Sequence, residues 1–403
     1  MNPALSLPDD PGLYIHVPYC AGKCGYCSFH SLPLGACPDF EPERMTTALL
    51  ARARALADRF GVPGFGTAYI GGGTPTALRP SALRTLLEGA ARLRPGTSFR
   101  EWTVEANPES LSALTLRILE DAGVDRISLG FQSGREEALR GAGRSAGVSE
   151  GLRALETAAA WKGRLSVDLM IGLPGQDPEG VRADIERAAA AGAEHLSIYG
   201  LTVEEGTPLE AAVREGSVDL PSEEIEADIW SAVAEACGSA GYLRYEVSNW
   251  ARPGAECRHN LNYWRGGVWI GTGPSAVSSV PLPDGGTLRI QETRDHEAYL
   301  RDPGACAREE IVPPATAAFE AVMTAFRTRE GLDSAAFRGR FGYYPEDLLS
   351  DTFAKWGALL EPGLRGPAPS DRLLDILNPF LLDCLSEMEG RAAGRIRAAG
   401  GRA

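Results

Sequence analysis

Near its start the chain reads Leu13-Tyr-Ile-His-Val-Pro-Tyr-Cys-Ala-Gly-Lys-Cys-Gly-Tyr-Cys-Ser-Phe29, in which Cys20, Cys24 and Cys27 directly follow a short β-branched and aromatic run. Thiolates are the usual protein ligands of iron–sulfur clusters, and a cubane needs four of them to be fully ligated. A compact set of three therefore leaves one iron with an open position. The stretch predicts a cluster at which a further ligand can bind.

A zinc knuckle, or a disulfide with one spare thiol, could also account for these cysteines. Structural zinc sites usually combine C-x₂-C pairs or late histidines, and no second C-x₂-C pair occurs in this chain. Disulfide frameworks are typical of small secreted chains, whereas this chain has 403 residues and eight cysteines. The spacing therefore favours a cluster. The remaining five cysteines are scattered, at positions 37, 237, 257, 306 and 384.

The composition is that of a large globular protein. Hydrophobic residues make up 44% of the chain, enough for an extensive core in two or three structural units. The 54 acidic and 40 basic side chains give a formal charge of -14, which opposes nonspecific binding to nucleic acid or to an anionic membrane. Neither a leader-like amino terminus nor a long apolar window is present. We expect a cytoplasmic protein without an integral membrane segment, whose partners are small molecules or proteins.

After the cysteines, helical patterns alternate with short apolar runs. Six strands separated by helices indicate parallel β/α units, because parallel neighbours need a helical crossover to return the chain. A partial barrel and an open doubly wound sheet both fit this alternation. The strands expected after the first one are 67–70, 99–105, 126–132, 165–171 and 195–200.

Polar or glycine-rich residues occur at the ends of these strands. In parallel β/α folds the functional site lies at the carboxyl ends of the strands, where several loops meet. This placement favours the barrel and puts the cysteines, which follow the first strand, at the same rim. The residues concerned are Gly72, Gly73 and Thr74, then Glu105 and Asn107, and finally Gln132, Asp168 and Tyr199.

The rim residues allow more than one interpretation. Gly71-Gly-Gly-Thr-Pro75 lacks the lysine and spacing of a phosphate loop, so it is either a tight turn or a backbone that a charged amino acid group can approach closely. Glu105 and Asp168 could cap helices or pair with an arginine. Their functional interpretation is to accept hydrogen bonds from an ammonium group and ribose hydroxyls, which suits carboxylates.

Beyond about residue 220 the pattern changes. A helix-like run at 221–240 precedes the segments 244–250, 258–264 and 266–274, which are expected to form a small β extension. The segment Val280–Gly286 predicts a hairpin turn. The predicted units are therefore residues 1–220, a barrel; 221–295, the β extension; and 296–403, a mainly helical C-terminal domain.

The motif Cys20-x₃-Cys24-x₂-Cys27, with Tyr26 before the last cysteine, resembles the radical S-adenosylmethionine (SAM) signature. The resemblance implies a 4Fe-4S cluster whose unique iron is chelated by the amino and carboxylate groups of SAM. Further segments between residues 12 and 335 resemble the oxygen-independent coproporphyrinogen III oxidase family, and within it a branch of heme chaperones. These segments are Tyr14–Cys20, Tyr69–Thr76, Val104–Pro108, Ser128–Ser133, Asp168–Gly175, Tyr245–Gly254 and His259–Trp264.

The resemblance also implies a fold and a cofactor pocket. The fold is α/β, a radical SAM partial (β/α)6 TIM-like barrel with the β extension and helical domain described above. Arg144 joins the pocket as a cation that can pair with the SAM carboxylate. The SAM-binding residues carried over are Tyr14, Gly72, Gly73, Thr74, Glu105, Gln132, Arg144 and Asp168.

Two features separate the oxidases of this family from the chaperones. The oxidases resemble C-x₃-C-x₂-C-x-C, and Phe29 stands in place of the fourth cysteine. The motif His-Asn-x-x-Tyr-Trp, present as His259–Trp264, marks the chaperone branch. One departure is Val277, where relatives commonly have histidine. His259 is the candidate heme ligand, and its alternative is a buried, hydrogen-bonded histidine in an aromatic cluster.

The predicted function is to bind heme, a 4Fe-4S cluster and SAM and to deliver heme to acceptor proteins. An electron donor and a homodimer are further expected partners. SAM cleavage is compatible with this machinery, and no catalytic residue is assigned. The alternative is an enzyme that oxidises coproporphyrinogen III or modifies another tetrapyrrole. Of the remaining histidines, His16 is expected to be structural or near the cluster, and His30, His195 and His296 to lie at the surface or in loops.

Overall fold

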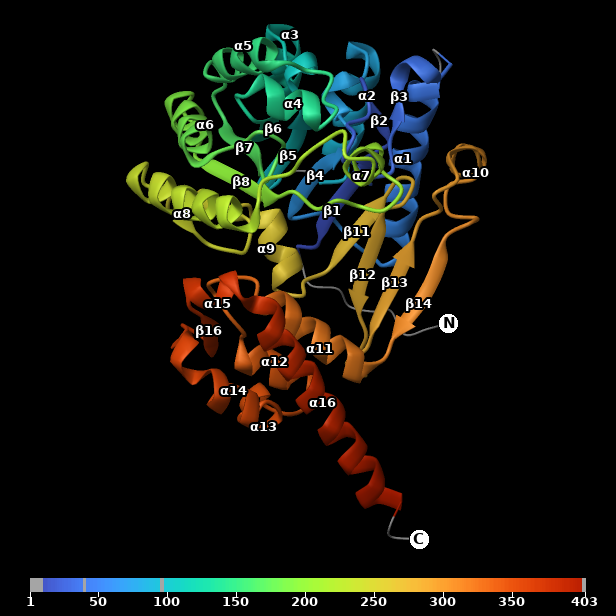
Figure 1. Cartoon of the computed structure of the whole chain (residues 1–403). Helices are drawn as coiled ribbons and strands as arrows, with labels where there is room; N and C mark the ends of the chain where they lie inside the picture. Colours follow the sequence, from blue (N-terminus) through green and yellow to red (C-terminus); the bar gives the residue numbers. More distant parts are fainter. Residues whose placement is uncertain (1–9, 39–40, 95–97, 401–403) are drawn as a thin grey trace.

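The computed structural model describes residues 10–38, 41–94 and 98–400. A large β/α layer is joined through a β extension to a separate helical unit, from which the last helix projects (Figure 1). This mixed α/β arrangement agrees with the predicted fold. Among the described residues, no helix combines the length and the apolar character needed to cross a membrane.

Six parallel strands form the centre of the sheet, in the order in which they occur in the chain. Helices on the outside return the chain between them, as the alternating pattern predicts. The strands are β1 (Gly12–Val17), β4 (Thr67–Gly72), β5 (Glu101–Ala106), β6 (Arg126–Gln132), β7 (Arg164–Ile171) and β8 (His195–Gly200). The helices are α1 (Glu41–Arg59), α2 (Pro80–Ala91), α3 (Ala113–Ala122), α4 (Glu136–Gly141), α5 (Val148–Ala158) and α6 (Pro178–Ala190).

The same sheet continues past both edges of this parallel core, so the barrel stays open. Beside β1 lies β11 (Trp269–Thr272), which is parallel to it, followed by three antiparallel strands. Beside β8 lies a short antiparallel pair. The antiparallel strands are β12 (Val277–Pro281), β13 (Thr287–Gln291) and β14 (Arg308–Val312) on one side, and β10 (Asn249–Ala251) and β9 (Leu243–Arg244) on the other. The predicted turn at 280–286 joins β12 to β13.

The segment Arg258–Trp264 is a helix, α9, and not part of the β extension as predicted. The reason lies in a distant residue. The buried carboxylate of Glu101, at the start of β5, accepts hydrogen bonds from the backbone N–H groups of Arg258 and His259, both at 2.9 Å. Free N–H groups at a helix start need such an acceptor. The helix is therefore stabilised by a contact that local sequence does not reveal.

His195 also differs from its prediction. It is 2% exposed and lies inside β8, where its ring nitrogens bond the hydroxyls of Ser166 at 2.8 Å and Tyr245 at 2.9 Å. His296, at the start of α10 (His296–Arg301), is half-buried and bonds Glu41 at 2.7 Å. Only His30 lies in a loop as expected. His195 and His296 have partners from distant parts of the chain: Ser166 in β7, Tyr245 between β9 and β10, and Glu41 at the start of α1.

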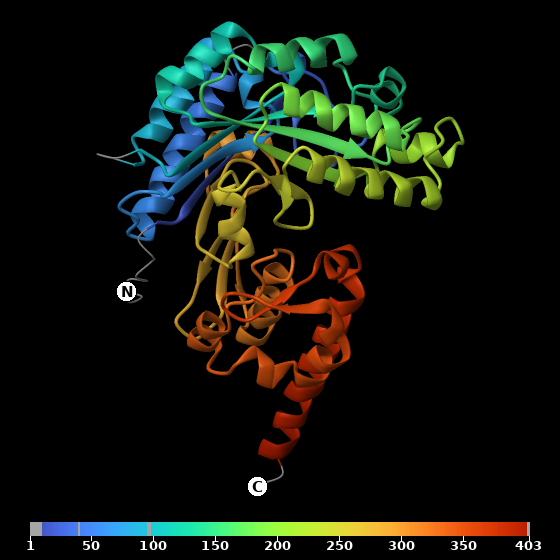
Figure 2. The same cartoon turned by 90° about the vertical axis from the view of Figure 1, so that its left-hand side faces the viewer.

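The C-terminal unit has its own core, in which the rings of Phe326, Phe353 and Phe380 pack together. In the side view, the C-terminal unit lies below the sheet (Figure 2). The division of the chain at 220 and 295 stays a prediction, and the pairing of β14 with β13 continues the sheet past residue 295. The unit comprises α11 (Pro314–Ala325), α12 (Ser334–Phe341), α13 (Pro345–Leu348), α14 (Ser350–Trp356), β15 (Leu360–Pro362), β16 (Pro367–Pro369), α15 (Asp371–Asp375) and α16 (Leu377–Gly400).

Candidate functional site

The three-cysteine loop follows β1 at the carboxyl end of the parallel strands. Its two ends are held together because β2 (Tyr19–Cys20) pairs with β3 (Leu32–Pro33). Its middle is held by Gly25, whose N–H donates to Ala142 O at 3.0 Å and whose carbonyl accepts from Leu209 N at 2.9 Å. These partners lie after α4 and in α7 (Pro208–Arg214). The loop is thus anchored to two distant segments of the rim.

All three cysteines are free thiols and partly exposed. Burial raises the pKa of the Cys20 and Cys27 thiols, so thiolate formation there calls for a cation. In the described ranges, no three His, Cys, Asp or Glu side chains converge on the position of a single metal ion. A cubane differs from a single ion because each thiolate binds its own iron. Three accessible thiols without disulfide partners fit such a cluster.

The glycine run after β4 packs directly against the backbone that leads to Cys20. Gly73 N donates to Val17 O at 2.8 Å, and a Cβ on Gly73 would lie 2.3 Å from Tyr19 O. Gly72 has a φ of 98°, and a Cβ there would lie 2.2 Å from Nδ1 of the buried His16. Side chains at these positions would clash. The glycines therefore form a tight backbone surface next to the cysteine loop.

Glu105 is bonded to this surface from the end of β5. Its carboxylate accepts hydrogen bonds from Gly72 N at 3.0 Å and from the Tyr69 hydroxyl at 2.8 Å. Burial raises the pKa of Glu105 to about 7, helped by the nearby charge of Asp168 and opposed by these hydrogen bonds. A buried carboxylate without a cation is costly, so the site favours a cationic ligand group such as an ammonium.

The raised pKa gives a prediction for the ligand-free protein. A carboxyl group whose pKa is higher in the folded than in the unfolded state stabilises the fold below about pH 4.3, and this contribution is lost as pH rises through 7. We expect Glu105→Gln to make the apoprotein more stable than wild type at pH 8 by about 1–3 kcal/mol, with little difference at pH 4.5. Thermal unfolding at both pH values measures this. An equal effect at both would contradict the raised pKa.

Arg144 lies in the loop between α4 and α5 and reaches toward the cysteine loop. Its guanidinium donates to Gly130 O at 2.9 Å and to the Tyr26 hydroxyl at 3.3 Å, with Cys24 Sγ at 3.8 Å. It also donates to Asn107 Oδ1 at 3.3 Å, and Asn107 Nδ2 donates to Thr74 Oγ1 at 2.8 Å. Arg144 and Thr74 are thereby joined across the rim.

Gln132 and Asp168 complete the rim residues predicted from sequence. Gln132 has a φ of 65°, an unfavourable backbone conformation for a non-glycine residue, at a bulge that ends the pairing of β6 with β7. Asp168 accepts from Ser128 Oγ at 3.0 Å, and burial raises its pKa. Tyr14 lies deeper, with its hydroxyl 3.0 Å from His16 Nδ1.

The structure thus gathers the predicted SAM residues at one rim, and it adds two that sequence reasoning left out of the pocket. Tyr69 positions Glu105, and Asn107 connects Thr74 with Arg144. Both residues occur in the segments that carry the family resemblance. That resemblance is the sequence signal from which they could have been predicted.

His259 lies at the other end of the strands. It is fully buried, and its ring nitrogens are both engaged, with the Thr67 hydroxyl at 2.8 Å and the Tyr263 hydroxyl at 2.7 Å. Burial lowers the pKa of His259 to about 4, so the ring is neutral. An iron atom could bind His259 only if one of these hydrogen bonds were broken.

Comparison with known proteins places this geometry in a family. Residues 14–188 match the model of the radical SAM superfamily. The heme chaperone HemW of Escherichia coli K12 is 39% identical over 293 residues, which is 72% of this chain and 75% of that protein. The chain belongs to the HemW family. The HemW of Mycobacterium tuberculosis H37Rv is 37% identical over 277 residues, or 67% of this chain and 70% of that protein.

The solved structure of the coproporphyrinogen III oxidase HemN from Escherichia coli, a radical SAM enzyme, has the same fold. The TM-score is 0.77 at 19% identity, over 94% of this chain and 92% of that one. The predicted barrel with its helical C-terminal region is confirmed. Membership of the radical SAM superfamily implies a 4Fe-4S cluster and SAM, whereas the role of each rim residue in this HemW-family chain stays a prediction.

Proposed function

We propose that this chain is a heme chaperone, which binds heme and delivers it to acceptor proteins. The observation that carries the proposal is the sequence identity of 39% between this chain and the HemW of Escherichia coli K12, over 75% of that protein. Phe29 supports it, because this 68%-exposed side chain stands where the oxidase pattern has a fourth cysteine. A thiol is therefore missing from the position that distinguishes the oxidases.

The proposed roles of the rim residues follow from their chemistry. When bound, the cluster would supply an electron to SAM. Cys20, Cys24 and Cys27 would hold it, Glu105 would accept hydrogen bonds from the SAM ammonium, and Arg144 would pair with the SAM carboxylate. The other residues proposed to line the SAM pocket are Tyr14, Gly72, Gly73, Thr74, Gln132 and Asp168.

For heme, His259 remains the proposed ligand, at the cost of the bond to Thr67 or Tyr263. Heme acceptor proteins, an electron donor, a homodimer and a cytoplasmic location are also proposals. These proposals rest on membership of the HemW family. The acidic composition of the chain separately disfavours binding to nucleic acid or to an anionic membrane.

We expect the reconstituted protein to bind about one hemin per chain and to leave coproporphyrinogen III unchanged under anaerobic, reducing conditions with SAM. Absorption titration measures the first, and porphyrin analysis measures the second. Formation of protoporphyrinogen would support the oxidase alternative and overturn the chaperone proposal. Comparison of His259→Ala with wild type in the hemin titration tests the ligand, since equal spectra and equal affinity would exclude His259.

A further inference from the structure

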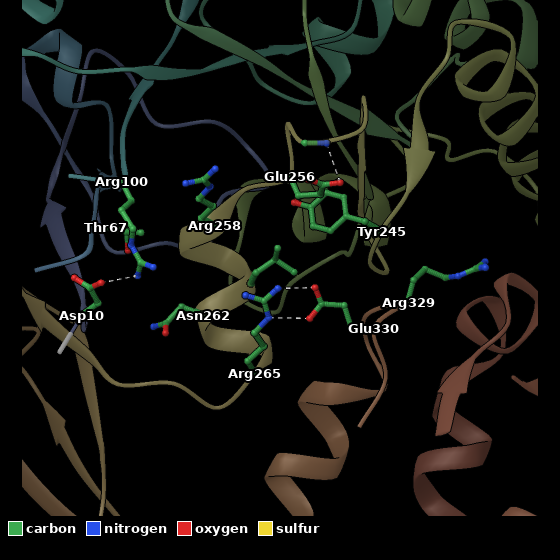
Figure 3. Close-up of a pocket in the computed structure, with 12 residues that line it drawn as sticks. Asp10, Thr67, Arg100, Tyr245, Glu256, Arg258, Asn262, Arg265, Arg329 and Glu330 are labelled. Carbon is green, nitrogen blue, oxygen red and sulfur yellow. Dashed lines mark hydrogen bonds and ion pairs between the residues drawn. The ribbon is translucent and has the colours of Figure 1, made fainter. Parts of the chain in front are cut away.

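A cavity of about 640 Å³ lies between the sheet and the C-terminal unit, at the end of the strands opposite the cysteine loop. One wall is α9, and another is the segment that follows α11, with Arg329 and Glu330 (Figure 3). Tyr245 and Thr67 also line it. Its size is that of a small-molecule pocket. No role in the cluster or SAM chemistry accounts for this cavity.

The two faces of α9 have different surroundings. Arg258, Leu261 and Arg265, which share one face at helical spacing, line the cavity together with Asn262. His259 points the other way, against Tyr69, with ring centroids 5.4 Å apart. Thr67, which bonds His259 Nδ1, lies between that ring and the cavity. The cavity side of the His-Asn-x-x-Tyr-Trp helix is therefore basic and apolar, and its histidine faces away from the cavity.

Four guanidinium groups line the cavity, and three of them have acidic partners. Arg265 makes two hydrogen bonds to Glu330, at 2.8 and 2.5 Å, Arg100 lies 3.4 Å from Asp10, and Arg329 pairs with Asp371. The exposed side chain of Arg258 has no hydrogen-bond or ion-pair partner within residues 10–38, 41–94 and 98–400. Its N–H fork is free to bind a ligand.

We propose that this cavity binds the carboxylate-bearing edge of a tetrapyrrole, with Arg258 as its principal anchor and Arg265 as a second cation. The inference rests on the proposed heme-carrying function and specifies how the carboxylates of the cargo are recognised. It assigns no ligand to the iron, because His259 faces away from the cavity and could reach an iron atom there only after its hydrogen bond to Thr67 is broken. Guanidinium groups match carboxylates in a bidentate geometry. The Arg265–Glu330 pair is about half exposed, at 56% and 49%, so it is weak and Arg265 can exchange Glu330 for a ligand carboxylate. Leu261 and Tyr245 offer apolar surface to the ring edge.

The test compares hemin with hemin dimethyl ester, which lacks the free carboxylates, on wild type, Arg258→Gln and a control, Arg153→Gln. Arg153 is exposed on α5, away from the cavity. We expect Arg258→Gln to weaken hemin binding about tenfold, the control to leave it unchanged, and the ester to bind wild type and Arg258→Gln equally. Circular dichroism checks that each variant is folded. Replacing Arg258 should not affect folding, because its side chain is exposed and has no partner among the described residues.

Unchanged hemin affinity in Arg258→Gln would overturn the proposal. An equal loss of affinity for hemin and for its ester would also overturn it, because Arg258 would then act without contacting the free carboxylates. Failure of wild type to bind hemin at all would instead refute the heme-carrying function. The two failures are thus distinguished by the wild-type titration alone.

Discussion

Replacing Cys20 with alanine is expected to abolish the iron–sulfur cluster. Anaerobic reconstitution should load about four irons per wild-type chain and close to none per Cys20→Ala chain, with loss of the visible absorption of the cluster. The reason is that three thiolates are proposed to hold the four irons, so losing one would leave two irons without a protein ligand. The same variant should lose SAM affinity, because the open iron supplies part of that binding.

The matched control is Cys306→Ala, which removes an exposed thiol far from the loop in sequence. It should load iron like wild type. Iron content of Cys20→Ala equal to that of the control would show that the cluster, if any, is held elsewhere. Two irons per wild-type chain would indicate a different cluster type.

The second large effect is expected from Glu101→Ala, and it concerns stability. Glu101 is fully buried and accepts hydrogen bonds from Arg258 N and His259 N, and it pairs with Arg164 at 3.1 Å. Removing it leaves the first amides of α9 without their acceptor and the buried guanidinium of Arg126 without the charge of Glu101, while Arg164 keeps its pair with Asp125. Breaking a buried charge pair in this way costs about 3–5 kcal/mol. Chemical unfolding measures it, with Glu389→Ala, exposed on α16, as the control.

The contribution of Glu101 to the free energy of unfolding should also depend on pH. Although burial raises the pKa of Glu101, the charge of Arg126 and the two backbone hydrogen bonds outweigh burial and hold that pKa below its usual range. A carboxyl group with a depressed pKa stabilises the fold above about pH 4.3, and this contribution is lost as pH falls further. The difference between wild type and Glu101→Ala should therefore shrink in acid. A constant difference down to pH 3 would contradict this account.

The sequence was sufficient to predict the strands and the rim because both depend on local patterns. Alternating helical and apolar runs determine parallel β/α units, and polar residues at strand ends must then meet at one rim. Glu105 and Asp168 could be recognised for this reason. Arg144 was found only through the family resemblance, because it lies in a loop with no periodic signal.

The rest depends on contacts between distant residues. Helix α9 forms where a β extension was expected because Glu101, far away in the chain, bonds its first amides. His195 was expected at the surface or in a loop, yet it is buried in β8, with partners in β7 (Ser166) and between β9 and β10 (Tyr245). The cavity beside α9 could not be predicted either, since its walls come from units far apart in sequence.

The placement of the cysteine loop and the cavity at opposite ends of the strands has a chemical consequence. The six residues of β1 alone span about 20 Å. Between the two ends lie the packed rings of His259, which bonds the cavity-lining Thr67, and Tyr69, which bonds Glu105 at the rim. A tetrapyrrole seated in the cavity would thus be separated by these side chains from a radical formed at the rim. The arrangement would protect the cargo from oxidation by its own carrier.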